Sequence, residues 1–329
     1  DYFIQPIFNC CLINIGDMLD NGTVMNGKLI ESPKSFQVAC TVMTQIISAV
    51  ASSQYGGQSV DVRHLGKYLR RSREKITRQI SGIAGGHLDD ETMNRLIDAR
   101  LREELKSGVQ TIQYQINTLM TTNGQSPFVT LFLNLDKDDE YLEENAMIVE
   151  EILRQRLEGI KNEKGVYVTP AFPKLIYVLD EHNCLKGGKY DYITKLAVEC
   201  SSKRLYPDYI SAKQMRATYQ GNVFSCMGCR SFLSPWKDEN GNFKFEGRFN
   251  QGVVSINLPQ IGILANKDED AFWKLFDERL ELCFEALMVR HNALKGIKSD
   301  VSPIHWQYGA IARLNKGETI DKLLYGGYS

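Results

Sequence analysis

The sequence has no excess of charge of either sign. Its 39 Lys and Arg residues balance 40 Asp and Glu residues, for a net charge of −1. Because nucleic acids and anionic membranes attract proteins through clustered positive charge, we expect neither as a partner, and phosphate binding has to be local. The chain also lacks a run of roughly 18 apolar residues, and residues 1–4 lack the basic character of a signal peptide. We therefore expect no membrane span and no export signal.

Cysteine and histidine are sparse and scattered. Eight cysteines in 329 residues do not form the dense, spaced pattern of a secreted disulfide framework, so we expect a reducing cytoplasm. A zinc site built on Cys226 and Cys229 needs a second closely spaced pair of ligands. The five histidines lie in unrelated contexts, and four other cysteines are solitary: Cys40, Cys184, Cys200 and Cys283. We expect no metal site and no catalytic histidine.

The chain does have enough apolar residues, 43%, for a sizeable core. It shows no internal repeat, low-complexity tract or long linker, so no domain boundary is visible. Strand patterns alternate with helix patterns; the strands are predicted at 8–15, 128–135, 174–179 and 252–258, and the helices at 36–53, 62–80, 90–121, 141–160, 190–204 and 270–294. Such alternation predicts the α/β class, with βα units around a largely parallel sheet that is either open or closed into a barrel.

Two consecutive long helices, 62–80 and 90–121, suggest an interaction surface such as a dimer interface. The first carries a run of positive charge that includes Arg71, Lys75 and Arg78. Two interpretations stay open for this run: an ordinary solvated helix face, and an anion-binding surface near a regulatory nucleotide.

The run SCMGCRSFL at 225–233 carries the strongest functional signal. A Gly next to Cys229 permits backbone geometry that a side chain would block, and apolar neighbours would keep water from the sulfur, as suits a protected reactive thiol. On spacing alone, half of a zinc site, a redox pair and an inert buried pair stay open. An early strand carries Cys10 and Cys11 on opposite faces, so only one of them can share a site with Cys229.

Several motifs then agree in one order along the chain. They are FNCCLI (8–13), ESPKS (31–35), NGQSPF (123–128), SCMGCRSFL (225–233) and GVVSINLP (252–259). The chain resembles the anaerobic (class III) ribonucleoside-triphosphate reductases, a family of glycyl-radical enzymes. The resemblance implies part of a ten-stranded α/β barrel made of two five-stranded halves around a central finger loop. Residues 1–329 would form a partial catalytic barrel domain, with a helical effector and dimer region at 36–121.

The resemblance also implies roles for single residues. Cys229 matches the transient thiyl radical on the finger loop, and Cys10 matches the strand thiol that donates hydrogen from the other face of the sugar, with Cys11 as the alternative. Asn250 matches a position where aerobic classes use a carboxylate, which implies formate as the reductant. The expected substrate-pocket residues are Met227, Asn9 and Ser126. We expect the Cys229 sulfur to project into a dry chamber, facing one early-strand thiol.

The remaining expectations concern partners and missing parts. Glu31, Lys34 and Gln45 match the region that binds an allosteric deoxynucleoside triphosphate or ATP near the interface of a homodimer. A radical S-adenosylmethionine enzyme would generate the glycyl radical. The radical glycine, the structural zinc cluster and the N-terminal nucleotide cone have no counterpart here, so we expect this chain alone to be inactive.

Two alternatives remain. One is another glycyl-radical enzyme, of the pyruvate formate-lyase type, which places its adjacent cysteines on the loop rather than in an early strand. The other, for this chain alone, is a nucleotide-binding regulatory module without turnover.

Overall fold

The computed structural model describes residues 8–122 and 124–327, so Asn123 of the NGQSPF motif lies outside it. A six-stranded sheet forms its centre, in the order β10-β1-β4-β5-β8-β9. The first five of these strands along the chain are parallel, and β10 pairs antiparallel with β1. The predicted α/β class and parallel sheet are confirmed. Five parallel strands match one expected half, while closure into ten strands stays a prediction.

The strands of this sheet are short and mostly buried, except for the edge strand β9, whose residues are half-buried or exposed. Their bounds are β1 Cys11–Leu12, β4 Gln58–Asp61, β5 Val129–Leu133, β8 Lys174–Leu179, β9 Asp208–Ser211 and β10 Arg248–Phe249. Strands β5 and β8 each lie between two other strands and are apolar apart from Thr130 and Lys174, as expected for parallel strands in the middle of a sheet. In register, Leu131 of β5 lies beside Leu175 of β8.

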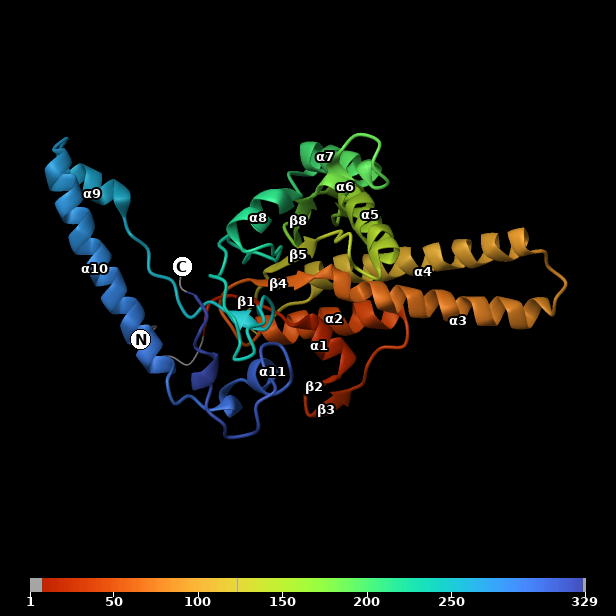
Figure 1. Cartoon of the computed structure of the whole chain (residues 1–329), viewed down its shortest axis with the longest axis horizontal. Helices are drawn as coiled ribbons and strands as arrows, with labels where there is room; N and C mark the ends of the chain where they lie inside the picture. The colour runs from red at the N-terminus through yellow and green to blue at the C-terminus, as the bar shows by residue number, and fades with distance from the viewer. Residues whose placement is uncertain (1–7, 123, 328–329) are drawn as a thin grey trace.

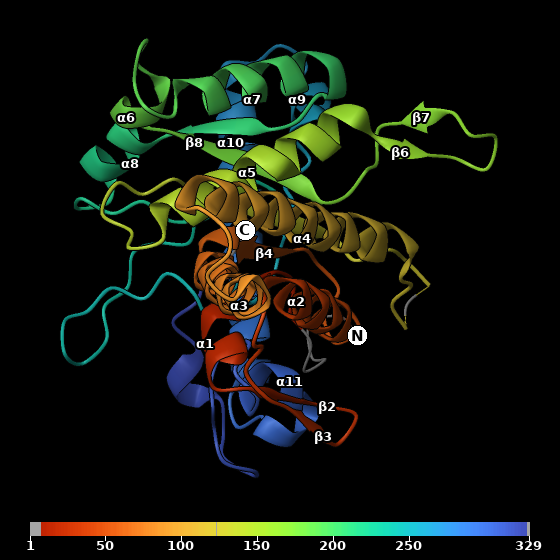
Figure 2. The ribbon, with the colours of Figure 1, turned by 90° about the vertical axis from the view of Figure 1, so that its right-hand side faces the viewer.

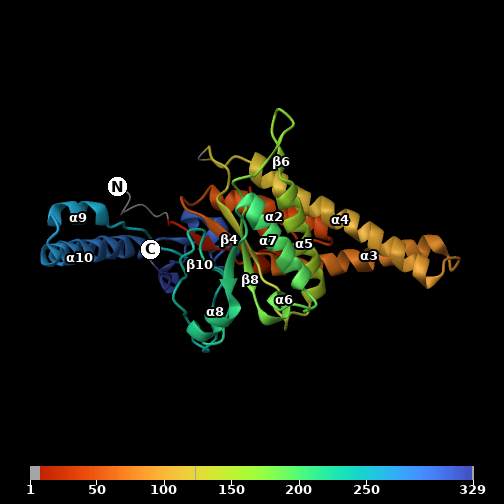
Figure 3. The same cartoon turned by 90° about the horizontal axis from the view of Figure 1, so that it is seen from above.

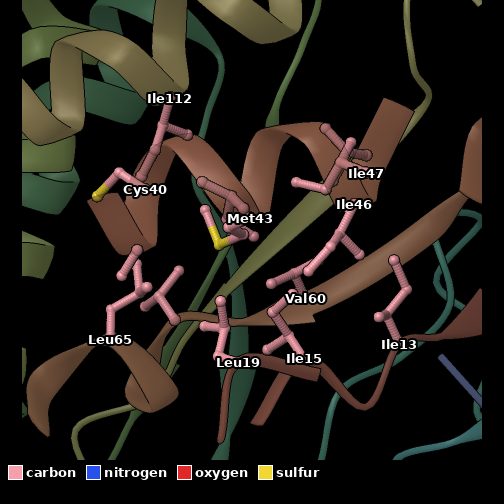
Figure 4. Packing of buried hydrophobic residues seen from close by; sticks show 14 of the residues in the cluster. Ile13, Ile15, Leu19, Cys40, Met43, Ile46, Ile47, Val60, Leu65 and Ile112 are labelled. Carbon is pink, nitrogen blue, oxygen red and sulfur yellow. The ribbon is translucent and has the colours of Figure 1, made fainter. Parts of the chain in front are cut away.

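Helices cover one face of the sheet and form the main core with it (Figures 1 and 2). They are α2 Phe36–Ala51, α3 Gly66–Ala84, α4 Asp90–Thr118, α5 Leu142–Glu158 and α7 Asp191–Arg204. Helix α2 begins at the cap Ser35 and buries Met43, Ile46 and Ile47 against Val60 of β4 (Figure 4). A Cβ at Gly108 of α4 would collide with the ring of Phe36, so this glycine permits the close packing of α2 on α4.

Two helical hairpins extend from opposite sides of the sheet (Figures 1 and 3). Helices α3 and α4 form one, and α3 ends at Gly85, whose φ of 54° is readily adopted only by glycine. Helices α9 (Leu258–Ala265) and α10 (Glu269–Leu294) form the other. Helix α10 leaves large apolar side chains exposed, including Trp273, Phe284 and Met288.

Shorter elements complete the fold. Two small hairpins pair β2 (Thr23–Met25) with β3 (Lys28–Ile30) and β6 (Ile160–Lys161) with β7 (Tyr167–Val168). The short helices are α1 Ile15–Asp20, α6 Glu181–Cys184, α8 Ala212–Thr218, α11 Pro303–Trp306, η2 Val62–Leu65, η3 Ser299–Val301 and η4 Asp321–Leu323. No helix in the described ranges is long and apolar enough to cross a membrane.

Two strand predictions require correction. The strand predicted over 8–15 is reduced to Cys11–Leu12, because Asn14 accepts a hydrogen bond from the amide of Asp17 and caps α1. The strand predicted over 252–258 is wrong. The chain pairs with β1 earlier, through Arg248 and Phe249, and Asn257 then caps α9, which has a proline in its first turn.

Candidate active site

A cavity of about 560 Å³ opens at the amino ends of four parallel strands. Cys10 stands directly before β1, Gly57 before β4 and Phe128 before β5, while Lys174 begins β8. The complete lining is Asn9, Cys10, Tyr55, Gly56, Gly57, Phe128, Thr130, Phe172, Lys174, Gly228, Cys229 and Val253. The cavity thus joins two thiols that are distant in sequence, one from the early strand and one from the loop.

Cys10 is held by the turn that precedes β4. The backbone amide of Gly57 donates a hydrogen bond to the Cys10 sulfur over 3.2 Å. A Cβ at Gly56 would collide with the side chain and carbonyl of Asn9, so only glycine permits this close approach. Burial raises the pKa of Cys10 to about 11, against the opposing hydrogen bond from Gly57. The thiol therefore keeps its hydrogen at neutral pH.

Cys11 faces the opposite side of the sheet. It is fully buried in the core between sheet and helices, whereas Cys10 packs with Leu12, Met227 and Leu233 on the cavity side. Strand alternation separates the two neighbours. Of the two cysteines between which the sequence did not decide, Cys10 lines the cavity.

Cys229 lies on the late loop, which contributes Gly228 and Cys229 to the lining of the cavity. Its sulfur is 2.6 Å from the hydroxyl oxygen of Ser231, and its side chain is exposed. The expectation of a dry chamber is therefore not met by the described residues.

The backbone of this loop is fixed by Arg230 and not by Gly228. A Cβ at Gly228 would make only ordinary van der Waals contacts, so the prediction that a side chain at this position would be blocked is wrong. Arg230 adopts a φ of 75°, a backbone conformation that residues other than glycine rarely adopt. Its guanidinium donates to Asp208 over 2.6 Å and to the carbonyl oxygen of Gly228 over 2.7 Å. These contacts clamp the turn that carries Cys229.

The other cysteine of the loop points away from the cavity. Cys226 is buried with Phe132, Ile176 and Val178, and the hydroxyl of Ser59 donates to its carbonyl oxygen over 2.8 Å. Both loop cysteines are free thiols. In the part of the chain that the structure describes, no group of three His, Cys, Asp or Glu side chains is arranged to hold a metal ion.

Asn250 and Met227 lie behind the cavity wall. The amide of Asn250 donates to the carbonyl of Cys10 over 2.8 Å, and its side-chain oxygen accepts from Gly252 over 2.9 Å. Both Asn250 and Met227 are fully buried. They therefore adjoin Cys10 without lining the cavity, and Ser126 also lies outside the lining, two residues before Phe128.

The structure adds residues that sequence reasoning missed. Phe128 and Phe172 stack with ring centroids 5.1 Å apart and make an apolar wall. Lys174 brings a positive charge into the lining and has no carboxylate partner among the described residues. A lysine at the first position of an apolar strand was the available sequence signal for it. Nothing in the sequence marked Thr130 or Tyr55 as residues of the cavity lining.

Of the three predicted effector-binding residues, Glu31, Lys34 and Gln45, the structure places one in the lining of a cavity. Lys34 lines a cavity of about 430 Å³ with Arg71, Glu74, Lys75 and Arg78 of α3. Arg71 also donates to the carbonyl of Pro33 over 3.1 Å, which ties α3 to the ESPKS segment. Glu31 and Gln45 are exposed and are not among the described residues that line this cavity.

Comparison with known proteins agrees along the whole chain. The family model described as anaerobic ribonucleoside-triphosphate reductase matches residues 1–329. The anaerobic ribonucleoside-triphosphate reductases of Enterobacteria phage T4 and Escherichia coli K12 are each 40% identical over 98% of this chain. These matches cover 53% and 44% of the relatives, so the chain spans about half their length.

Solved structures share the fold. The anaerobic ribonucleotide reductase from Thermotoga maritima in complex with dATP and CTP superimposes with a TM-score of 0.60, over 91% of this chain and 48% of that one. The same enzyme with glycerol in its active site also gives 0.60. The identity is 13% in both cases, so this likeness concerns the fold. Together with the family model and the 40% identical relatives, it shows that the chain belongs to the anaerobic ribonucleoside-triphosphate reductase family.

Proposed function

We propose that the protein containing this chain reduces ribonucleoside triphosphates to 2′-deoxyribonucleoside triphosphates by thiyl-radical chemistry. The observation that carries the proposal is the shared cavity of Cys10 and Cys229. At about 560 Å³ it lies within the range of small-molecule sites, roughly 300–1,000 Å³. Its two thiols come from two separate segments, the early strand and the late loop, as thiol chemistry on both faces of a ribose requires.

Cys229 is the proposed hydrogen-abstracting group. A sulfur radical there takes the hydrogen atom from C3′ of the ribose and becomes a thiol, and the 2′-hydroxyl takes up a proton from solvent and leaves as water. The reductant, for which we propose formate, supplies two electrons and one hydrogen and is released as carbon dioxide, so that ribonucleotide, formate and one proton give deoxyribonucleotide, carbon dioxide and water. The glycyl radical, when present, supplies the unpaired electron. The exposure of Cys229 fits the approach of such a group. The clamp of Arg230 on Asp208 holds the loop during the exchange.

Cys10 is the proposed hydrogen donor near the 2′ position. Its raised pKa keeps the thiol protonated, and a thiolate would have no hydrogen to give. Asn250 adjoins Cys10 through the backbone, and an amide supplies hydrogen bonds without acting as a base. We propose formate as the reductant, and the positive charge of Lys174 in the lining suits its carboxylate or a substrate phosphate.

The basic cavity beside Lys34 is the proposed effector site. Three cations of α3 join Lys34 around a space of about 430 Å³, and Glu74 is the acidic residue of the lining. Clustered Arg and Lys side chains favour phosphate groups. We propose that a deoxynucleoside triphosphate or ATP binds there and that the projecting α3–α4 hairpin takes part in a homodimer. We also propose that a separate radical S-adenosylmethionine enzyme acts as a partner and generates the glycyl radical.

Replacing Cys229 by Ser in the activated full-length protein tests the catalytic proposal. We expect deoxyribonucleotide formation to fall to background, because a hydroxyl does not form the radical that a thiol forms, while effector binding is unchanged. Cys184→Ser is the matched control, since Cys184 is an exposed thiol on α6, outside the cavity. Normal product formation by Cys229→Ser would refute the assignment.

A further inference from the structure

A buried glutamine, Gln54, contacts the turn that holds Cys10. It lies between the end of α2 and the start of β4 and is only 1% exposed. Its side-chain nitrogen donates to the carbonyl oxygen of Gly56 over 3.1 Å and to that of Gly57 over 2.9 Å. A primary amide carries two hydrogens, and these two carbonyls account for both. The Gln54 side chain therefore binds both glycines of the turn.

The peptide group between Gly56 and Gly57 connects Gln54 to Cys10. Its carbonyl oxygen accepts a hydrogen bond from Gln54, and its N–H is the group that donates to the Cys10 sulfur over 3.2 Å. This peptide is trans, so its C=O and its N–H lie in one plane and point in opposite directions. A hydrogen bond that fixes the direction of the carbonyl therefore also fixes the direction of the N–H toward the sulfur.

The two glycines make this direction easy to lose. A peptide group between two glycines can rotate at little steric cost, because neither residue has a Cβ. Backbone hydrogen bonds hold the N–H of Gly56, which donates to Asn9, and the carbonyl of Gly57, which accepts from Cys11. These two groups belong to the flanking peptides and leave the peptide between the glycines unrestrained. Gln54 supplies the hydrogen bond to the oxygen of that peptide.

His305 of α11 orients Gln54 from the other side. The side-chain oxygen of Gln54 lies 3.2 Å from Nε2 of His305, and because this oxygen is an acceptor, Nε2 carries the hydrogen. The other ring nitrogen, Nδ1, is 2.7 Å from the hydroxyl of Ser302, which donates to it. Burial lowers the pKa of His305 to about 3 and so keeps this neutral form. Hydrogen bonds thus run in one direction from Ser302 through His305 and Gln54 to the turn, and each polarises the next.

We propose that Gln54, oriented by His305, is a positioning residue for the Cys10 thiol. The inference rests on the proposed function, in which Cys10 donates a hydrogen to the substrate. An N–H group cannot accept a hydrogen bond, so while the N–H of Gly57 faces the sulfur, the S–H hydrogen is free for the cavity that Cys10 lines. Rotation of the peptide would turn the Gly56 carbonyl toward the sulfur, and that oxygen would bind the hydrogen that the substrate needs.

Gln54→Met tests the proposal, because methionine has a similar length and lacks both donors. Crystals of the unactivated full-length variant should show the N–H of Gly57 turned away from the Cys10 sulfur. In the activated variant, kcat should fall about 10- to 100-fold with little change in KM. Gln155→Met is the matched control, since Gln155 is a buried glutamine of α5 that donates to the carbonyl of Lys106 over 3.0 Å. The control should keep the wild-type kcat and the wild-type turn.

Two variants of His305 separate positioning from packing and decide the question if Gln54→Met does not fold. His305→Gln keeps a donor for Gln54 and should retain most of the kcat, whereas His305→Leu lacks the donor and should lose about 10-fold. A role in packing alone, against the ring of Phe8, predicts that His305→Leu is at least as active as His305→Gln. That result, or an unmoved turn in Gln54→Met, would overturn the proposal. Absence of deoxyribonucleotide formation in the wild type would instead refute the proposed function, and the crystal structure would still decide the direction of the N–H.

Discussion

At the scale of single residues, two adjacent cysteines have opposite surroundings. The sulfur of Cys10 accepts a hydrogen bond from Gly57 and lines the cavity, and that of Cys11 packs in the core. Strand alternation predicted that they would separate but not which would face inward. The deciding contact is the close approach of Gly56 to Asn9, which joins residues that are far apart in sequence.

Other features at this scale were not predictable from local sequence. Lys174 and the Arg230 clamp could not be predicted, because packing between distant segments decides whether a charged side chain has a partner. By contrast, Cys229 and Asn250 were singled out from motifs whose local sequence is specific, and their catalytic roles stay predictions. The prediction that the position next to Cys229 requires glycine was wrong, because a glycine in a motif suggests tight backbone geometry even where the structure leaves room for a side chain.

The clamp on Arg230 leads to a prediction about turnover. Asp208→Asn removes the negative charge that Arg230 contacts and frees the strained turn. Because a misplacement of about 1 Å can cost a factor of about 10² in rate, we expect kcat to fall about 10- to 100-fold with little change in KM. Steady-state kinetics of the activated full-length protein measure both. Glu199→Gln, which alters an exposed carboxylate that binds Lys203, is the control and should behave as wild type. An unchanged kcat in Asp208→Asn would remove the positioning role.

At the scale of elements, apolar runs in the sequence predicted strands, whereas a strand made mainly of polar residues was not predicted. Strand β8 was predicted at its observed bounds because 174–179 is a buried apolar run. Strand β4 was missed, since Gln58, Ser59 and Asp61 are polar although all are buried. Several of their polar groups are paired through tertiary contacts, such as the hydrogen bond from the side-chain nitrogen of Gln58 to the carbonyl of Ile47 over 2.9 Å, although the side-chain oxygen of Gln58 has no partner among the described residues. Such contacts leave no periodic trace in the sequence.

One contact between elements makes stability depend on pH. His64 of η2 lies 2.8 Å from Glu246, which precedes β10. Burial alone would lower the pKa of His64, but the charge of Glu246 and the hydrogen bond to it outweigh burial, so the pKa is raised. This pair therefore stabilises the fold fully below the unfolded pKa, about 6.5, and its contribution is lost as pH rises through the raised pKa of His64.

Glu246→Gln tests this link between η2 and β10. We expect the wild type to exceed the variant in free energy of unfolding by at most about 1 kcal/mol at pH 6, because both side chains are partly exposed. The difference should shrink at pH 9. Urea unfolding at the two pH values measures it. A difference that grows with pH would show that the charge pair does not stabilise the protein as we describe.

At the scale of the whole molecule, the end of the described chain packs back on its beginning. His305 of α11 is fully buried, with Ser302 2.7 Å and Gln54 3.2 Å from its ring nitrogens. Its ring also meets that of Phe8 edge-on, with centroids 4.6 Å apart. Burial lowers the pKa of His305 to about 3, so the folded protein holds it neutral.

This buried histidine predicts a loss of stability in mild acid. Below about pH 6.5 the unfolded chain binds a proton at His305 that the folded chain does not, so stability falls as pH decreases toward 3. Between pH 7.5 and 5.5 the wild type should lose about 1.4 kcal/mol more than His305→Gln. Urea unfolding of the two proteins checks this, with exposed His87→Gln as the control. Equal losses in wild type and His305→Gln would show that His305 is not held neutral.

The central claim also belongs to the whole molecule: an early strand and a late loop place one thiol each in a single cavity. Deoxyribonucleotide formation by Cys10→Ala, compared with Cys11→Ala in the same activated full-length protein, tests it most directly. We predict a loss of roughly 10³-fold or more in Cys10→Ala, because the inward hydrogen donor is gone, and near-normal turnover in folded Cys11→Ala. Normal turnover in Cys10→Ala together with a loss in Cys11→Ala would contradict the account.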